Sequence, residues 1–193
     1  MLLLYAIAAG LLAGSVAGGR IAALADLHIR WLGVAVLGLA FQLVLFHPLT
    51  AERVGDLGPV LYVVSTLAVF AALLHNLSLP GLPIVALGAA LNLVAILANG
   101  GAMPSDPAAW MALTGVAAIP TDDFTNSVLI GPGTALPWLS DVFVLPRPIP
   151  LANVFSIGDV LIAVGIAWCV ARSMRRPDAA AWRRASVAAP APR

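Results

Sequence analysis

Apolar residues along this chain gather into five long runs, separated by short polar or proline-rich segments. The runs cover residues 2–19, 31–48, 59–78, 81–103 and 151–172. A helix that crosses a bilayer core needs about 20 consecutive apolar residues, and each run is close to that length. The pattern therefore predicts an all-α fold: an integral membrane bundle of about five transmembrane helices, forming one domain over residues 1–172.

The composition agrees with a membrane location. Hydrophobic residues make up 61% of the chain and charged residues 10%, against roughly 45–50% and about 25% in soluble domains. No basic run is large enough to hold a nucleic acid. The one cysteine, Cys169, excludes an intrachain disulfide and a cysteine-based metal site. We expect a lipid bilayer as the surroundings of the chain, and no nucleic-acid partner, metal or cofactor.

The positions of the arginines predict the orientation of the bundle. Cytoplasmic segments of membrane proteins carry an excess of basic residues. Arg20 and Arg30 lie between the first two runs, and further arginines follow from Arg172 onward, whereas residues 104–150 contain Arg147 and four aspartates. We therefore expect a protein of the bacterial inner membrane with its N-terminus outside and its C-terminus in the cytoplasm. Residues 173–193, rich in Ala, Pro and Arg, are expected to form a flexible cytoplasmic tail.

Residues 104–150 are long for a simple connection and form the outer-face loop of this topology. Loops of this length are usually functional or disordered, and the aromatic residues of this one argue against disorder. Ser105, Asp106 and Pro107 have the pattern of a helix start, in which a capping residue precedes a proline. The pattern predicts a short helix over residues 107–116.

Two features could contact other membrane proteins. One is the outer loop, and the other is the series Gly10, Gly14 and Gly18 in the first run. Small residues spaced four apart let a second helix approach closely. That second helix could belong to this chain or to a partner, and the shortness of the five runs favours packing within the chain.

Asp159 is the only charged side chain in residues 151–171. An acidic side chain at membrane depth is costly without a partner or water, so it marks a candidate functional site. If the fifth helix begins near Leu151, Asp159 lies roughly 12 Å below the outer surface. The alternative interpretation is a buried structural acid, hydrogen-bonded to Asn92, Ser156 or a neighbouring backbone group.

A second carboxylate, Asp141, precedes Asp159 by eighteen residues and lies in the outer loop. The chain must return to the same surface between them, so the two side chains can meet there. Two carboxylates a few ångströms apart share a proton, and such a pair can act as general base and general acid. Upstream, the block Asn99-Gly100-Gly101-Ala102-Met103-Pro104 closes the fourth run at the same surface. Its asparagine could hydrogen-bond a carboxyl group, or the block could simply end a helix.

These blocks resemble a known family. Lipoprotein signal peptidase, the aspartic signal peptidase II of bacteria, has an Asp followed about eighteen residues later by a Phe-Asn-x-Ala-Asp block that opens its last helix. Here Asp141 is followed by Phe155-Ser156-Ile157-Gly158-Asp159, and Asn99 begins a block similar to the family's Asn-x-Gly-Ala block. The resemblance implies that Asp141 and Asp159 form the catalytic pair and that Asn99 is a supporting polar group.

The resemblance covers about a third of the chain. The family's Gly-Asn-x-x-Asp-Arg block has no counterpart, because residues 126–140 read NSVLIGPGTALPWLS. As a whole the chain resembles a group of uncharacterised bacterial membrane proteins that carry Asn-Gly-Gly-x-Met-Pro and Phe-Ser-Ile-Gly-Asp blocks. The missing block favours a non-catalytic membrane subunit or an assembly or stabilising factor. The alternative is an outer-leaflet aspartyl hydrolase that uses Asp141 and Asp159.

Overall fold

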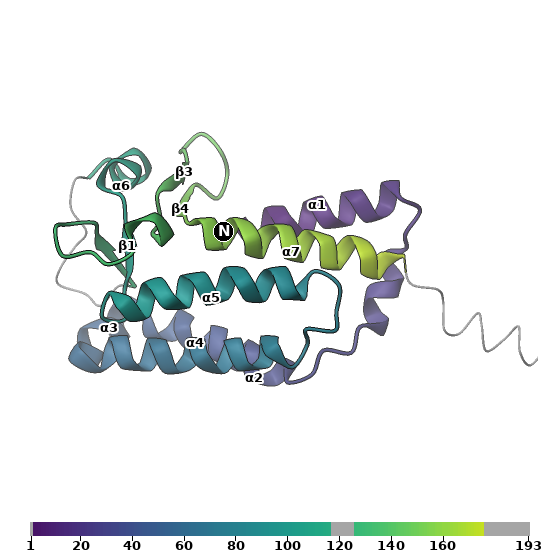
Figure 1. The fold of residues 1–193 in the computed structure, drawn as a ribbon, viewed down its shortest axis with the longest axis horizontal. Helices are drawn as coiled ribbons and strands as arrows, with labels where there is room; N and C mark the ends of the chain where they lie inside the picture. The colour runs from purple at the N-terminus through teal and green to yellow at the C-terminus, as the bar shows by residue number, and fades with distance from the viewer. Residues whose placement is uncertain (1, 117–125, 176–193) are drawn as a thin grey trace, which may run out of the picture.

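The structure is a computed structural model that describes residues 2–116 and 126–175, and it is mostly helical (Figure 1). Five long helices run along its longest dimension. Each corresponds to one of the five predicted apolar runs: α1 (Leu2–Val16), α2 (Leu32–Leu45), α4 (Gly58–Leu74), α5 (Leu82–Ala98) and α7 (Ile157–Met174). The predicted helical character of the chain is confirmed.

Two helices in the described part of the chain are both long and apolar enough to cross a membrane. One is α4 together with the 3-10 turn η2 (Gly55–Leu57), which gives 20 residues with a mean hydropathy of 2.2. The other is α7, with 18 residues and a mean hydropathy of 1.6. Helices α1, α2 and α5 are apolar but shorter.

The predicted bounds of the last two runs were wrong at their outer ends. Helix α5 ends at Ala98 because Gly100 and Gly101 follow with φ of 70° and 92°, a left-handed backbone that a helix does not continue. Helix α7 begins at Ile157 rather than near Leu151, which has φ of 59°. Residues 153–155 form a strand instead, so Asp159 lies in the first turn of α7.

The fold is not entirely α-helical, because four short strands pair in the region between α5 and α7. Strand β1 (Met103–Ser105) pairs in parallel with β2 (Ser127–Leu129). Strand β3 (Phe143–Leu145) pairs antiparallel with β4 (Asn153–Phe155). This pairing satisfies backbone N–H and C=O groups that no helix satisfies there. Three-residue strands carry too short a pattern for the sequence to reveal.

The predicted loop helix is present as α6 (Pro107–Thr114) and ends two residues earlier than predicted. The carboxylate of Asp106 caps it, accepting hydrogen bonds from the backbone N–H groups of Ala108 and Ala109, both at 2.9 Å. Gly115, with φ of 76°, ends it. The 3-10 turn η3 (Pro137–Leu139) follows later in the same region.

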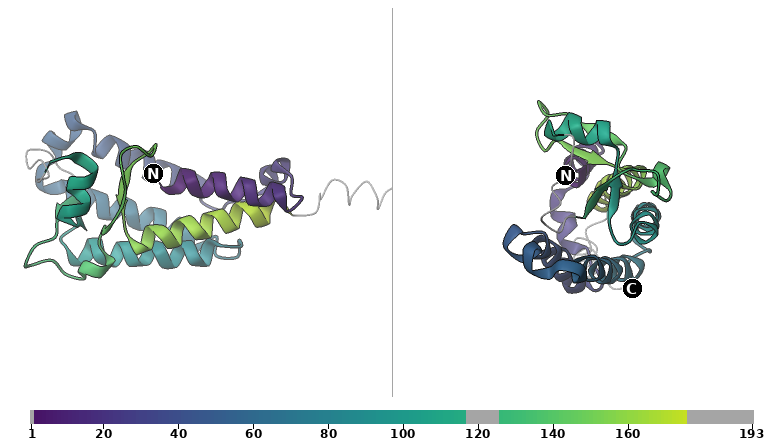
Figure 2. Two further views of the ribbon diagram at one scale, coloured as in Figure 1. Left: turned by 90° about the horizontal axis from the view of Figure 1, so that it is seen from above. Right: turned by 90° about the vertical axis from the view of Figure 1, so that its left-hand side faces the viewer.

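The helices pack in a definite order. Helix α7 lies between α1 and α5, and α4 lies between α5 and α2. The short elements η1 (Ile21–Asp26) and α3 (Pro48–Val54) connect the ends of α1, α2 and α4. The elements between α5 and α7 gather at one end of the molecule, and the right-hand view of Figure 2 looks onto that end. This end corresponds to the outer face in the predicted topology.

Glycines allow α1 and α7 to approach closely. A Cβ at Gly10 would lie 2.7 Å from the backbone oxygen of Ala167, and one at Gly14 would collide with Met174. These two members of the predicted glycine series therefore pack within the chain. Gly18 is different, since nothing lies within 4 Å of its Cβ position. Contacts of the glycine series or the outer loop with other proteins stay a prediction.

Two clusters of buried side chains form the core. One joins α2, α4 and α5 around Leu45, Tyr62 and Ala95. The other joins α5 and α7 around Val85 and Cys169, so the cysteine packs as a small apolar side chain. Helix α7 ends at Met174, and residues 176–193 of the predicted tail lie outside the described residues.

Candidate active site

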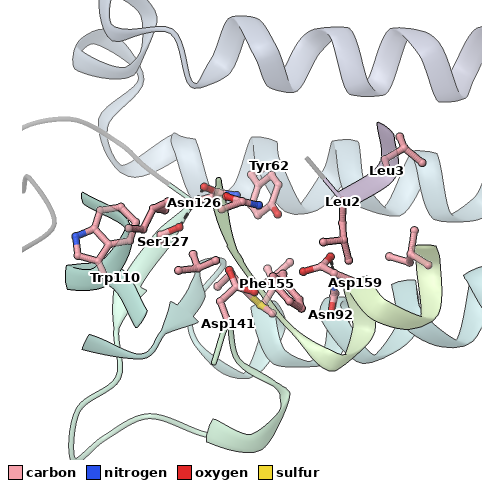
Figure 3. Close-up of a pocket in the computed structure, with 16 residues that line it drawn as sticks. Leu2, Leu3, Tyr62, Asn92, Trp110, Asn126, Ser127, Asp141, Phe155 and Asp159 are labelled. Atoms are coloured by element: carbon pink, nitrogen blue, oxygen red, sulfur yellow. Dashed lines mark hydrogen bonds between the residues drawn. The ribbon is translucent and has the colours of Figure 1, made fainter. Parts of the chain in front are cut away.

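A cavity of about 340 Å³ lies where α1 and α7 begin, beside the elements that connect α5 to α7 (Figure 3). Side chains from many parts of the chain line it. Its polar lining residues are Tyr62, Asn92, Asn126, Ser127, Asp141, Asn153 and Asp159. Both predicted carboxylates therefore face the same cavity, although they come from a loop and from a helix.

Asp159 lies in the first turn of α7 and closes a capping box with Ser156. The hydroxyl of Ser156 accepts a hydrogen bond from the Asp159 backbone N–H at 3.1 Å, and the Ser156 backbone N–H donates to Asp159 Oδ2 at 2.9 Å. This reciprocal arrangement satisfies two backbone donors that a helix start leaves free. The carboxylate thus has a structural role in starting α7, besides facing the cavity.

Asn92 of α5 holds the other carboxylate oxygen. Its Nδ2 donates to Asp159 Oδ1 at 2.9 Å, and its Oδ1 accepts from the Ser156 hydroxyl at 2.8 Å. A side chain at Gly158 would collide with the Asn92 amide, so glycine is required there. Hydrogen bonds to Asn92 and Ser156 were the alternative interpretation of Asp159, and the structure contains both. Donors therefore reach both of its carboxylate oxygens.

Asp141 is held through its backbone. Its N–H donates to the Pro104 carbonyl at 2.8 Å, and its own carbonyl accepts from the Asp106 N–H at 2.9 Å. These bonds join residue 141 to the end of β1, where it lies beside Ser105. The block from Asn99 to Pro104 therefore serves the site by leading into the strand that positions Asp141.

The carboxyl group of Asp141 has different surroundings from that of Asp159. Its Oδ1 is buried and has no hydrogen-bond partner. Burial, and secondly the charge of Asp159, raise the pKa of Asp141 from 3.8 to about 7. A carboxyl group with this pKa carries a proton through most of the mildly acidic range and releases it near neutral pH.

Asn99, the third predicted site residue, is placed elsewhere. Its Nδ2 donates to the carbonyls of Ala95 and Ala135 at 2.8 and 2.9 Å, and its Oδ1 accepts from the Ala135 N–H at 2.9 Å. These bonds fasten the outer loop to the end of α5. Asn99 does not belong to the described residues that line the cavity, and Asn92 is the asparagine that contacts a carboxylate.

Several lining residues had no signal in the sequence. Asn126, Ser127 and Asn153 come from strands or strand edges whose pairing is not local. Tyr62 had a weak signal, as an amphipathic side chain near the outer end of the third apolar run. Among the described residues, no group of three or more His, Cys, Asp or Glu side chains could hold a metal ion.

One protein family matches most of this chain. A family model described as "Family of unknown function (DUF5317)" matches residues 26–171. The chain belongs to the DUF5317 family. No curated protein and no solved structure matches it.

The matched DUF5317 region contains Asn92, Asp141 and Asp159, together with the Asn99–Pro104 and Phe155–Asp159 blocks. Helix α1 lies before the matched residues, although Leu2 and Leu3 line the cavity. The DUF5317 description states no activity, so the resemblance of the two blocks to lipoprotein signal peptidase stays a hypothesis.

Proposed function

We propose that the protein is a polytopic membrane protein with an aspartic hydrolase site at the outer end of its helix bundle. Exposed apolar side chains on all five long helices support the membrane location. Examples, one from each helix in chain order, are Val16, Leu43, Val64, Leu87 and Trp168. Soluble monomers rarely expose apolar surface on this scale, and lipid would cover it.

The distribution of charge supports the proposed orientation in a bacterial inner membrane. Arg20, Arg172 and Arg175 lie at the end where α1 and α7 finish. Arg30 lies at the start of α2, where Asn76 binds its backbone at 2.8 and 2.7 Å. An excess of arginine marks the cytoplasmic side, so the carboxylate cavity at the opposite end would face outward.

The depth of the cavity fits a site that acts on a membrane-tethered molecule. Asn92 precedes the last residue of α5, Ala98, by six residues, which corresponds to about 9 Å along the helix axis. The cavity would then lie below the outer membrane surface. Apolar side chains such as Leu2, Ile96 and Ile162 line it beside the polar groups. A substrate with an apolar segment next to a polar bond suits this lining.

The observation that carries the proposal is the different hydrogen bonding of two carboxyl groups in one cavity. In the proposed reaction, Asp159 accepts a proton from a water molecule as that water attacks a substrate carbonyl carbon. Asp141 donates its proton to the leaving nitrogen or oxygen as the C–N or C–O bond breaks. The products are a carboxylic acid and an amine or alcohol. A general acid with a pKa of about 7, as Asp141 has, can donate its proton at neutral pH.

The test uses the full-length protein in lipid nanodiscs and a set of acylated fluorogenic peptides as substrates. We expect the wild-type protein to cleave some of them. Asp141→Asn and Asp159→Asn should each lower the rate about 100-fold or more, because each removes a proton-transfer group.

The matched control is Asp56→Asn, which changes an exposed acid outside the cavity. It should cleave at the wild-type rate. Thermal unfolding of all variants shows whether any loss of rate comes from a loss of fold. A folded Asp141→Asn variant that cleaves at the wild-type rate would refute the proposed chemistry.

A second candidate is a non-catalytic membrane subunit or assembly factor, and the capping box favours it. The carboxylate of Asp159 already has a structural partner in Ser156 and another in Asn92. On this view the carboxylate of Asp159 only stabilises the start of α7, and the outer elements bind another protein. It expects a stoichiometric partner to co-purify from native membranes and no cleavage of any acylated peptide.

A further inference from the structure

A second, shallower groove of about 200 Å³ lies at the opposite end of the molecule from the carboxylate cavity. It forms where the end of α1 meets the last turns of α7. Its lining residues are Ala17, Trp168, Ala171, Arg172 and Arg175. The four residues from α7 are spaced three, one and three apart, so they lie on one face of that helix.

The close packing of α1 on α7 fixes the walls of this groove. The two helices approach at Gly14 and Met174, and the N–H of Arg20 donates to the Met174 carbonyl at 2.8 Å just beyond. Among the described residues, Ala17 at the end of α1 is the one lining residue that does not come from α7. The small side chains at positions 17 and 171 leave the space that the indole of Trp168 borders.

The groove combines an apolar floor with a positive rim. Trp168 is 56% exposed although it is large and apolar. Arg172 and Arg175 are exposed beside it, and no carboxylate in the described part of the chain pairs with either guanidinium. Tryptophan and arginine are both characteristic of the interface between lipid tails and headgroups, and guanidinium groups bind phosphate oxygens in a paired geometry.

We infer that this groove binds the headgroup of an anionic phospholipid of the inner leaflet. The phosphate would lie between the guanidinium groups of Arg172 and Arg175, and the first acyl carbons would lie on Trp168 and Ala171. This inference rests on the proposed membrane location but is independent of the hydrolase chemistry. Free phosphate would leave the floor and the indole uncovered, so charge and shape together favour a lipid.

The test measures quenching of tryptophan fluorescence by brominated lipids, with the full-length protein in phosphatidylcholine nanodiscs. The discs contain increasing fractions of phosphatidylglycerol or phosphatidylcholine that carry bromine on the acyl carbons nearest the glycerol. We expect half-maximal quenching at a mole fraction at least about fivefold lower for the anionic lipid, since two arginines contact its phosphate. Trp168→Phe should remove this anionic component, which assigns it to the groove.

The double variant Arg172→Gln, Arg175→Gln tests whether the two arginines cause the preference for the anionic lipid. In this variant both lipids should give half-maximal quenching at the same mole fraction. Arg53→Gln is the matched control, because it removes an exposed arginine from α3 at the opposite end. It should keep the wild-type preference, and so should the wild-type protein in millimolar inorganic phosphate.

Three results would overturn the inference: equal quenching by both lipids in the wild-type protein, a preference that survives in the double variant, or a preference abolished by inorganic phosphate. Failure of quenching by either lipid would instead refute the membrane location itself. The lipid preference and the presence of quenching are both measured without peptide cleavage, so they do not depend on the proposed hydrolase activity.

Discussion

Asp141 and Asp159 show how neighbouring carboxyl groups acquire different properties from their surroundings. Asp159 accepts hydrogen bonds from Asn92 and Ser156. Asp141 is fixed by its backbone and keeps a buried oxygen without a partner. The environment thus separates the two groups into an acceptor and a proton carrier, and this separation is how acid and base roles are assigned in sites with two carboxyl groups.

The raised pKa of Asp141 predicts a pH-dependent stability. The folded state keeps the proton of Asp141 up to about pH 7, whereas the unfolded chain releases it near pH 4. Folded protein therefore binds more protons between these values, and stability should fall as pH rises through this window. We expect the Tm of the wild-type protein in detergent to fall from pH 5 to pH 8.

The Asp141→Asn variant should lose this component, because its amide does not titrate and resembles the protonated acid in shape. The matched variant Asp56→Asn should keep the wild-type slope of Tm against pH. If Asp141→Asn and the wild-type protein gave the same slope, the burial of a titrating Asp141 would be contradicted.

At the scale of single elements, the start of α7 does most to position the side chains of the cavity. The capping box of Ser156 and Asp159 begins the helix, and the same serine orients Asn92. The block Phe155-Ser156-Ile157-Gly158-Asp159 is therefore a structural unit whether or not it is catalytic. Gly158 belongs to it because α5 passes too close for a side chain.

Ser156→Ala should lower the free energy of unfolding by about 1 kcal/mol, the usual cost of losing a helix cap. Denaturant or thermal unfolding in detergent measures this change. Ser15→Ala is the control, since Ser15 is an exposed residue of α1, and exposed substitutions usually shift stability by less than about 0.5 kcal/mol. Equal effects of the two substitutions would show that the capping box does not stabilise the fold.

Helices were predictable from the sequence, while the details around the site were not. Apolar runs are a local signal, so each of the five long helices corresponds to one predicted run, and Asp106 correctly marked the start of α6. Because the chain must return to the same end of the bundle between Asp141 and Asp159, the sequence indicated that the two side chains could meet, and both line one cavity. The strand pairing, and the bonds from Asn99 to Ala135, join residues far apart in the chain and leave no pattern in a single sequence.

At the scale of the whole molecule, the proposed topology places the two ends of the bundle on opposite sides of a membrane. Single cysteines in a Cys169→Ala background would test it with a membrane-impermeant thiol reagent. Pro132→Cys lies in the outer loop, and Ser78→Cys lies in the exposed turn between α4 and α5. We expect labelling of position 132 in intact cells, and of position 78 only after lysis.

Two other labelling patterns would contradict the proposed topology. Labelling of position 78 in intact cells, with position 132 protected, would invert the orientation and move the carboxylate cavity to the cytoplasmic side. Labelling of both positions would contradict a bundle that spans the membrane.

The position of α7 between α1 and α5 also bears on how the protein is made. A ribosome produces α1 first and α7 last, and chains generally begin to fold during synthesis. Helix α1 packs mainly on α7, so α1 lacks this neighbour until α7 has been made, and Gly10 and Gly14 stay uncovered by α7 until then. The packing of α1 therefore forms only after α7 has been made, when α7 takes its place between α1 and α5. Any factor that protects the nascent chain would have to release α1 only when α7 is available to pack on it.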